Sequence, residues 1–153
     1  MVDVMVVAEK PKKEKSKKPK KDKLIVVRGK RKESIASASI KKGKGVVRVN
    51  KRLLSAIPDF SQKLIMGEPI VLAGDVAMAV DIDVTVRGGG RMGQAEAVRV
   101  AIARAFVEFT GNDELKKFYM SVDRNLLVED HRRVEPKKYL GPKARARFQK
   151  SYR

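Results

Sequence analysis

Hydrophobic and polar residues alternate in several short stretches of the chain, and this pattern predicts β-strands. Residues 24–27 are continuously apolar. In residues 36–40 apolar side chains alternate with serines, and residues 46–49 follow a glycine-rich turn. The longest alternation covers residues 80–86, where two aspartates and a threonine occupy every second position. A period of two places one face of a strand on the core and the other toward water or a polar partner. The sequence therefore predicts a sheet with one polar face.

Helical periodicity is strongest in residues 94–109, where large apolar side chains recur every three or four positions. This stripe consists of Val98, Ile102, Phe106 and Phe109. The alanines between these residues allow the helix to pack closely on its neighbours. A second helix is predicted for residues 113–122, with Asn112 as its N-cap and two acidic residues in its first turn.

The middle of the chain and its end give weaker patterns. Residues 53–57 and 61–66 are interpreted as short helical pieces separated by Pro58, and residues 68–74 ("EPIVLAG") as another strand. The chain after residue 130 is basic, contains proline and glycine, and has no sustained periodicity. We therefore expect an α/β fold, in the form of a two-layer α+β domain, followed by an extended tail.

Positive charge is concentrated at the two ends of the 153-residue chain. The net charge is +18, from 36 Lys and Arg against 18 Asp and Glu. Residues 1–23 hold nine lysines and four acids, and residues 131–153 hold nine basic residues and one acid. We predict a disordered lysine-rich extension (1–23), a folded domain (24–130) and an extended basic RNA-binding tail (131–153).

This charge makes nucleic acid the leading class of partner and an anionic membrane surface the second. No stretch approaches the length of a membrane-spanning helix, and the basic tail lacks the apolar stripe of a membrane-surface helix. The N-terminus has neither the basic start nor the long apolar run of a signal peptide, so we expect a cytoplasmic protein.

Composition also narrows the possible chemistry. The chain has no cysteine and one histidine, His131, which excludes thiolate and multi-histidine metal sites. His131 lies among charged residues, where a solvated loop histidine is more common than a catalytic one. We therefore expect no catalytic residue, no metal site and no cofactor.

Gly88, Gly90 and Gly93 form the pattern G-x-G-x-x-G between a predicted strand and a predicted helix, as in dinucleotide-binding folds. Three features oppose a dinucleotide site. The preceding strand alternates instead of being apolar on both faces, no acid ends a second strand about 20 residues on, and no repeated βαβ unit follows. Two interpretations stay open: a tight turn in which glycine avoids clashes, and a phosphate-binding turn flanked by Arg87 and Arg91.

Several sequence motifs along the chain resemble those of a known family. They include "GKRKESIASASI", "GKGVVRVN", "VDIDVTVRGGGRMGQAEAVRVAIARAF", "LVEDHRRVEPKK" and "RARFQKSYR". From residue 24 onward the chain resembles small-subunit ribosomal protein nine, and the ending "QKSYR" is similar to its archaeal and eukaryotic cytosolic branch. Residues 1–23 lie outside this resemblance.

The resemblance implies a fold like the second domain of ribosomal protein five, with a left-handed crossover. It implies a structural protein of the small-subunit head that binds rRNA, neighbours other head proteins and contacts peptidyl-site tRNA through its tail. Carried over by position, Lys150 and Arg153 would contact the tRNA. The implied rRNA contacts are Arg28, Lys30, Arg31, Lys32, Arg87, Arg91, Arg132, Arg133, Lys137, Lys138, Arg145 and Arg147.

Two other functions remain open on the sequence. A free-standing protein that compacts DNA or coats double-stranded RNA would carry similar charge. A nucleotide-dependent enzyme would use the glycine motif, and it would bind a nicotinamide or flavin nucleotide stoichiometrically.

Overall fold

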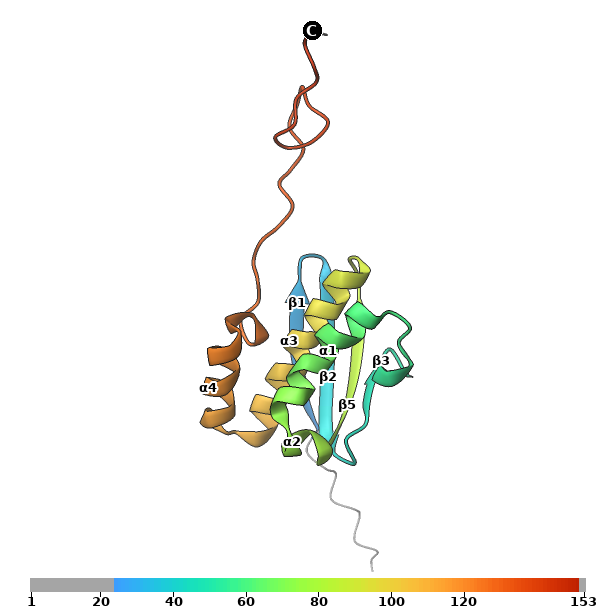
Figure 1. Cartoon of the computed structure of the whole chain (residues 1–153), viewed down its shortest axis with the longest axis vertical. Helices are drawn as coiled ribbons and strands as arrows, with labels where there is room; N and C mark the ends of the chain where they lie inside the picture. Colours follow the sequence, from blue (N-terminus) through green and yellow to red (C-terminus); the bar gives the residue numbers. More distant parts are fainter. Residues whose placement is uncertain (1–23, 152–153) are drawn as a thin grey trace, which may run out of the picture.

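The structure, a computed structural model, describes residues 24–151, in which five strands precede or separate the helices (Figure 1). The predicted extension 1–23 lies outside these residues. The strands are β1 (Ile25–Arg31), β2 (Ser34–Lys42), β3 (Val47–Val49), β4 (Arg52–Leu53) and β5 (Val80–Arg87). The helices are α1 (Phe60–Ala73), α2 (Asp75–Met78), α3 (Arg91–Thr110) and α4 (Asp113–Val122), with 3-10 turns η1 (Leu54–Ala56) and η2 (Arg124–Leu126).

The strands form one mixed sheet in the order β1-β2-β5-β3-β4. Strands β1, β2 and β5 pair antiparallel, and β3 pairs parallel with β5. The register places Ser37 of β2 between Arg28 of β1 and Thr85 of β5. The central strand β5 is therefore the one with the predicted alternation, and its polar positions lie on the outer face.

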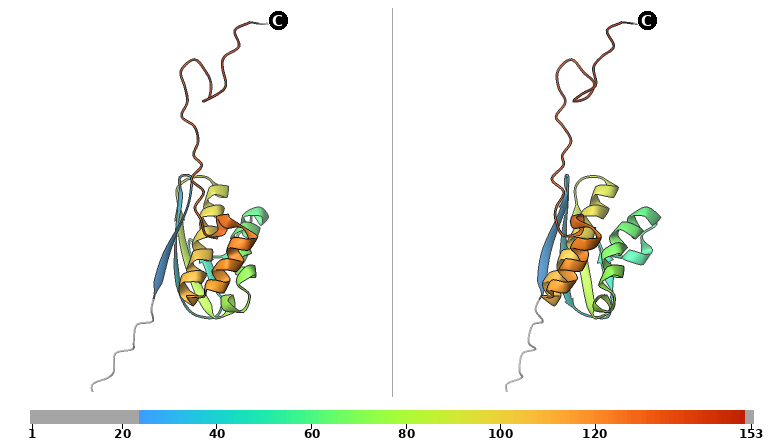
Figure 2. Two further views of the ribbon diagram at one scale, coloured as in Figure 1. Left: turned by 90° about the vertical axis from the view of Figure 1, so that its left-hand side faces the viewer. Right: turned by 60° about the vertical axis from the view of Figure 1, so that its left-hand side comes forward.

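Helices α1 and α3 cover one face of the sheet, and the opposite face is open (Figures 1 and 2). Figure 2 shows this two-layer arrangement edge-on, with α4 beside α3. The predicted two-layer α/β class is confirmed. The open face is polar because every second residue of β2 and β5 points away from the helices.

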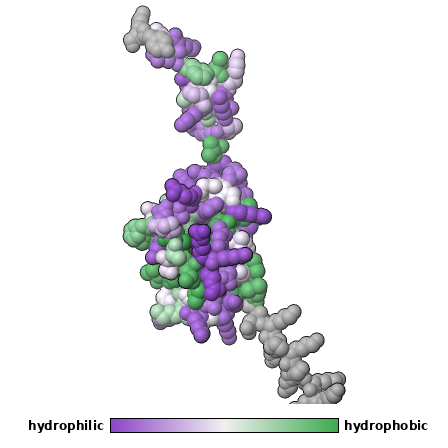
Figure 3. Space-filling view, turned by 90° about the vertical axis from the view of Figure 1, so that its right-hand side faces the viewer, coloured by the Kyte–Doolittle hydropathy of each residue, from purple (hydrophilic) through white to green (hydrophobic). Residues whose placement is uncertain are grey.

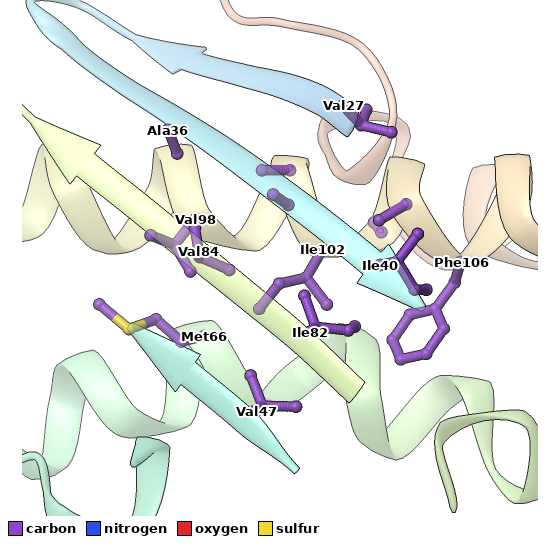
Figure 4. Close-up of a cluster of buried hydrophobic side chains, with 14 of the residues drawn as sticks. Val27, Ala36, Ile40, Val47, Met66, Ile82, Val84, Val98, Ile102 and Phe106 are labelled. Atoms are coloured by element: carbon purple, nitrogen blue, oxygen red, sulfur yellow. The ribbon is translucent and has the colours of Figure 1, made fainter. Parts of the chain in front are cut away.

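Apolar side chains from both layers meet in a continuous core (Figure 4). Three of the four residues in the predicted stripe of α3 are fully buried, and Phe109 packs at the edge of the core. Figure 4 labels core residues from the strands (Val27, Ala36, Ile40, Val47, Ile82, Val84), from α1 (Met66) and from α3 (Val98, Ile102, Phe106).

Strand β1 and helix α3 approach so closely that only glycine fits between them. A Cβ atom on Gly29 would collide with the backbone carbonyl oxygen of Ala97 and the amide nitrogen of Ala101. Both alanines are fully buried. Interiors are close-packed, so such a backbone-to-backbone contact leaves no room for an added methyl group. The alanine-rich composition of α3 thus reflects its short distance from the sheet.

Two side chains hold the turns around β5. The carboxylate of Asp81 accepts hydrogen bonds from the amides of Lys44 (2.8 Å) and Val46 (3.1 Å), which close the glycine turn before β3. These bonds lower the pKa of the Asp81 carboxyl. The amide of Asn50 donates to the carbonyl of Val86 (3.2 Å) and accepts from its N–H (2.9 Å), so it continues the pairing beyond the end of β3.

The two long helices predicted after residue 90 are confirmed. Helix α3 begins at Arg91 instead of residue 94 and ends at Thr110, followed by Gly111, whose φ of 60° is the left-handed conformation typical of a helix C-cap. Helix α4 has the predicted bounds, and the Asn112 side chain accepts from the Glu114 amide (3.2 Å) as its N-cap.

The strand predicted for residues 68–74 is wrong, because residues 68–73 continue helix α1 and Gly74 is its C-cap. A short apolar run does not distinguish a strand from a buried helix, and here Met66, Pro69 and Ala73 form the buried side of the helix. The Tyr119 hydroxyl of α4 donates to the Pro69 carbonyl (2.7 Å) inside this interface. Residues 53–57 are divided between β4 and the 3-10 turn η1.

The contact between β1 and α3 predicts a position-specific stability effect. Gly29→Ala is expected to lower the free energy of unfolding by about 1–3 kcal/mol, because the added methyl group overpacks two backbones. Gly67→Ala is the matched control: Gly67 lies in α1 with open space around it, so alanine should stabilise the protein by up to about 1 kcal/mol. Urea unfolding of both variants measures the difference. Equal stability of the two variants would contradict the close approach.

Candidate nucleic-acid interface

The open face of the sheet is basic at one end, whereas the other end carries acidic and basic side chains together, with Asp81 opposite Lys41 and Asp83 opposite Arg48. The register aligns Lys30 of β1, Ile35 of β2 and Arg87 of β5 in one row. Arg28 lies in a neighbouring row, whereas Asp81 belongs to the far end of β5. Lys30 and Arg87 lie on either side of Ile35 with no acid in their row, so this end of the sheet favours an anionic partner.

Loops and the start of the tail add charge to the same end of the domain. Lys32 lies exposed in the β1–β2 turn, and Arg91 is the exposed first residue of α3. Arg133 reaches back to this turn, donating to the Lys32 carbonyl (3.4 Å). Seven of the predicted rRNA contacts therefore gather here, and we call them the basic end: Arg28, Lys30, Lys32, Arg87, Arg91, Arg132 and Arg133.

The glycine motif packs against the β1–β2 turn. Gly88 and Gly89 have φ values of 78° and 63°, which favour glycine. A Cβ atom would collide with the Glu33 carbonyl oxygen at Gly88 and with the Ser34 hydroxyl at Gly89. The Ser34 hydroxyl donates to the Gly88 carbonyl (3.0 Å), as does the Gln94 side chain (3.1 Å). The tight-turn interpretation thus accounts for Gly88 of the motif and for its neighbour Gly89, but not for Gly90.

The surroundings of this turn differ from a dinucleotide site. Strand β5 pairs antiparallel with β2, and in the described chain α3 leads to α4 and η2 instead of to a parallel strand. The N-terminus of α3 remains exposed beyond the turn. Gly90 caps it without a side-chain hydrogen bond and has open space around it. The N–H groups in the first turn of α3, which begins at Arg91, suit a phosphate, so the phosphate-binding interpretation stays a prediction.

Ion pairs fix the point where the tail leaves the domain, residues 127–133, which we call the tail root. The Asp130 carboxylate accepts from the Arg132 side chain (2.9 Å) and amide (2.8 Å) and pairs with Arg31 (3.2 Å). Arg31 also binds Glu96 of α3. The hydrogen bonds from Arg132 and the charge of Arg31 hold the pKa of Asp130 well below its ordinary range. The Asp130 carboxylate is therefore ionised at neutral pH, and its ion pairs hold the tail root against the domain.

A second arginine braces the tail root from α3. Arg104 donates to the carbonyl of Leu127 (2.8 Å), to the carboxylate of Glu129 (3.0 Å) and to the carbonyl of Arg28 (2.9 Å). Its bond to the Arg28 carbonyl satisfies a backbone acceptor of β1, an edge strand of the sheet. One side chain thus joins helix, edge strand and tail root.

Sequence reasoning did not identify Arg99 and Arg104 as organising residues. Arg99 of α3 pairs with Glu68 of α1 and with Asp123, the N-cap of η2. Burial lowers the pKa of Arg99, but the hydrogen bonds that Arg99 donates to the two carboxylates outweigh this effect and raise it. The available signal was positional: both arginines interrupt the otherwise apolar, alanine-rich run from residue 97 to residue 107.

The described part of the tail, residues 131–151, contains a closed loop. Arg145 binds the Glu135 carboxylate through two nitrogens (2.6 and 2.9 Å), and Arg147 donates to the Tyr139 carbonyl (2.8 Å). Figures 1 and 2 show the tail running away from the domain and turning back on itself before its end. The side chains of Lys137, Lys138, Arg147 and Lys150 are exposed.

The structure therefore divides the predicted binding residues. Arg31 is set apart from the others, because only 15% of its side chain is exposed and two carboxylates bind it. The predicted tRNA contact Arg153 lies outside the described residues. The remaining members form the basic end and a tail set consisting of Lys137, Lys138, Arg145, Arg147 and Lys150.

Comparison with known proteins decides the family. The family model for Ribosomal protein S9/S16 matches residues 29–153. A small ribosomal subunit protein uS9 from Methanothrix thermoacetophila is 49% identical over 131 residues, covering 86% of this chain and 99% of its own. Proteins of the same name from Desulfurococcus amylolyticus (50% identical, 86% and 94% covered) and Methanococcus vannielii (44%, 86% and 99%) are similar. The chain belongs to the ribosomal protein S9/S16 family.

Membership in the S9/S16 family confirms the resemblance found in the sequence, including its archaeal branch. The role of the chain is structural, not enzymatic, and its location is the ribosome. Membership implies rRNA and other ribosomal components as partners. Among the described residues, no helix is long and apolar enough to cross a membrane, and no cluster of acidic or histidine side chains is suited to a metal.

The ion pairs of the tail root predict a local effect of Asp130→Asn. Loss of the carboxylate should leave the domain folded and speed trypsin cleavage after Arg132 and Arg133 several-fold, because these peptide bonds lose their anchor. Glu135→Gln is the control, since it also removes one acid close to these bonds but leaves the tail root intact. Mass spectrometry of timed digests measures both rates.

The pH dependence of this effect follows from the depressed pKa of Asp130. The Asp130 carboxylate stabilises the tail root fully above the ordinary aspartate pKa of about 3.9. This stabilisation is lost only as pH falls through the lower pKa that Asp130 has in the folded protein. The ratio between variant and wild-type rates should therefore stay constant between about pH 6 and pH 8. Equal cleavage of the wild type and Asp130→Asn would contradict the proposed anchor.

Proposed function

We propose that the chain is a structural constituent of the small ribosomal subunit, where the basic end and the tail bind rRNA and the tail tip contacts peptidyl-site tRNA. The distribution of charge in the tail supports this proposal most directly. Residues 131–153 hold nine basic residues and one acid, and that acid, Glu135, is paired with Arg145. The positive charge of this tail is otherwise left without acidic partners in its own segment.

The basic end and the tail would bind rRNA by neutralising phosphates and releasing their counterions. The basic end presents charge on a rigid sheet, so it suits docking of the domain in one orientation. Arginines in both sets can hold phosphate oxygens with two parallel hydrogen bonds. Arg31, which is already bound by two carboxylates, would act by holding the tail root in place.

The division into a folded domain (24–130) and two basic arms belongs to this proposal. The first strand begins at Ile25 and the last regular element, η2, ends at Leu126, which supports these boundaries. The tail would become protected from trypsin when rRNA neutralises it. The expected fold relationship to the second domain of ribosomal protein five and the left-handed crossover remain predictions.

Contact with tRNA would lie at the end of the chain. Lys150 is exposed near the end of the described tail, and Arg153 is the final residue of the sequence. Twelve peptide steps separate Gly141 from Arg153, so an extended tail would reach roughly 40 Å beyond that glycine. The loop closed by the Glu135–Arg145 pair shortens the tail. The tail tip would therefore reach the tRNA only if this loop opened or if the loop itself lay close to the tRNA.

Sucrose-gradient fractionation tests the assignment to the small subunit. The chain should migrate with small subunits and with whole ribosomes, and high salt should release it only as other rRNA-bound proteins are released. A protein that compacts DNA would instead sediment with genomic DNA. Recovery of the chain outside ribosomal fractions would contradict the proposal.

Deletion of Arg153 tests the tRNA contact separately from rRNA docking. Subunits should contain the variant in normal amounts, because many other basic residues would bind rRNA. Peptidyl-site tRNA should dissociate about fivefold faster, as expected for loss of about 1 kcal/mol at a screened contact. The difference should narrow as salt rises, and Arg153→Lys should recover part of it. Unchanged dissociation at low salt would remove the tail tip from the proposed function.

A further inference from the structure

The loop in the tail is built to hold a defined shape. The Glu135–Arg145 pair and the Arg147–Tyr139 hydrogen bond close it at two levels. At its tip Gly141 is buried, and a Cβ atom there would collide with the carbonyl oxygen of Ala146. Leu140, with a φ of 62°, adopts the left-handed conformation that the turn requires. Such strain persists only where surrounding contacts fix the backbone.

This loop surrounds a hollow of about 570 Å³, within the range of small-molecule sites. Tyr139, Leu140 and Phe148 supply its apolar wall, and they are 85%, 64% and 64% exposed. Lys138, Arg147 and Lys150 line it with positive charge. Figure 3 shows this combination as apolar surface between hydrophilic side chains in the tail above the domain.

We propose that this hollow binds one unstacked nucleobase of single-stranded RNA, with the base on the rings of Tyr139 and Phe148 and its phosphates on the surrounding cations. This inference deepens the proposed function and depends on its claim that the tail lies on RNA. Stacking of bases on aromatic rings tolerates every base, because each has a π-face. Insertion of one base into the loop would fix the position of the tail on rRNA more firmly than phosphate contacts alone.

The observations favour RNA over an apolar protein segment as the occupant. Every charged side chain that lines the hollow is positive, so the occupant must bring negative charge close to its apolar surface. The phosphates and flat bases of an unpaired nucleotide combine both properties. The one acid of the tail, Glu135, is bound by Arg145 and does not line the hollow.

Fluorescence of 2-aminopurine in a short single-stranded RNA tests the site in the full-length protein. Stacking should quench the fluorophore when the wild-type chain binds. Tyr139→Ala and Phe148→Ala should each weaken binding about tenfold and remove most of the quenching, without changing the salt dependence. Tyr139→Phe should behave as the wild type because it keeps the ring. Phe60→Ala is the control that removes an exposed ring from α1, 72% exposed, and should have no effect.

The shape of the loop gives an independent test. Gly141→Ala leaves every ring and charge in place but obstructs the contact with Ala146, so it should also reduce quenching. If the ring variants and Gly141→Ala quench as the wild type does, while Lys138→Gln and Lys150→Gln weaken binding, the stacking site is wrong and the RNA-binding tail stands. If the wild-type chain binds no RNA and enters no subunit, the proposed function fails as well.

A photo-reactive residue identifies the occupant in assembled subunits. Phe148→p-benzoylphenylalanine should cross-link to rRNA or tRNA on irradiation, whereas the same replacement at Phe60 should not reproduce that product. A cross-link from position 148 to a protein neighbour, with none to RNA, would overturn the proposed site.

Discussion

The fold depends on the contact in which helix α3 lies directly on strand β1, at a distance that admits only glycine and alanine. Gly29 meets the backbone at Ala97 and Ala101 without an intervening side chain. This short distance brings the polar flanks of α3 within reach of the segment after η2. Glu96 and Arg104 of α3 can therefore engage the tail root, directly or through Arg31. Close packing of two small-residue surfaces thus determines where the tail begins.

The arginines of the chain serve two physical roles. Arg31 and Arg99 are mostly buried and paired with carboxylates, and removal of one partner of a buried pair is costly. The arginines of the basic end are largely exposed, where an isolated ion pair contributes little; among them Arg132 also anchors the tail root through Asp130. The inner set fixes the geometry, and the proposed function assigns the outer set, together with the tail, to phosphate. A highly basic chain can thus keep a defined fold while much of its charge remains available.

Sequence reasoning found the features that depend on local pattern. The strands around residues 36–40 and 80–86, the helix with Val98, Ile102 and Phe106, and the Asn112 cap all follow from periodicity and capping chemistry. The errors and omissions involve distant residues. Residues 68–73 are helical because α1 buries one side on the core, and Arg31 binds carboxylates 65 and 99 positions away. The glycine motif was ambiguous because its explanation, the Ser34 turn, lies 54 residues earlier.

The account is tested most directly by mapping what lies beside the tail and the domain in a translating ribosome. The chain has no cysteine, so a single cysteine at Ser151 or Ser37 can carry an iron chelate that cleaves nearby RNA by hydroxyl radicals. From Ser151 we expect cleavage of peptidyl-site tRNA and adjacent rRNA, and from Ser37, on the open face of the sheet, cleavage of rRNA alone. Cleavage of tRNA from neither position, or an identical rRNA pattern from both, would contradict a tail that leads away from the docked domain to the tRNA.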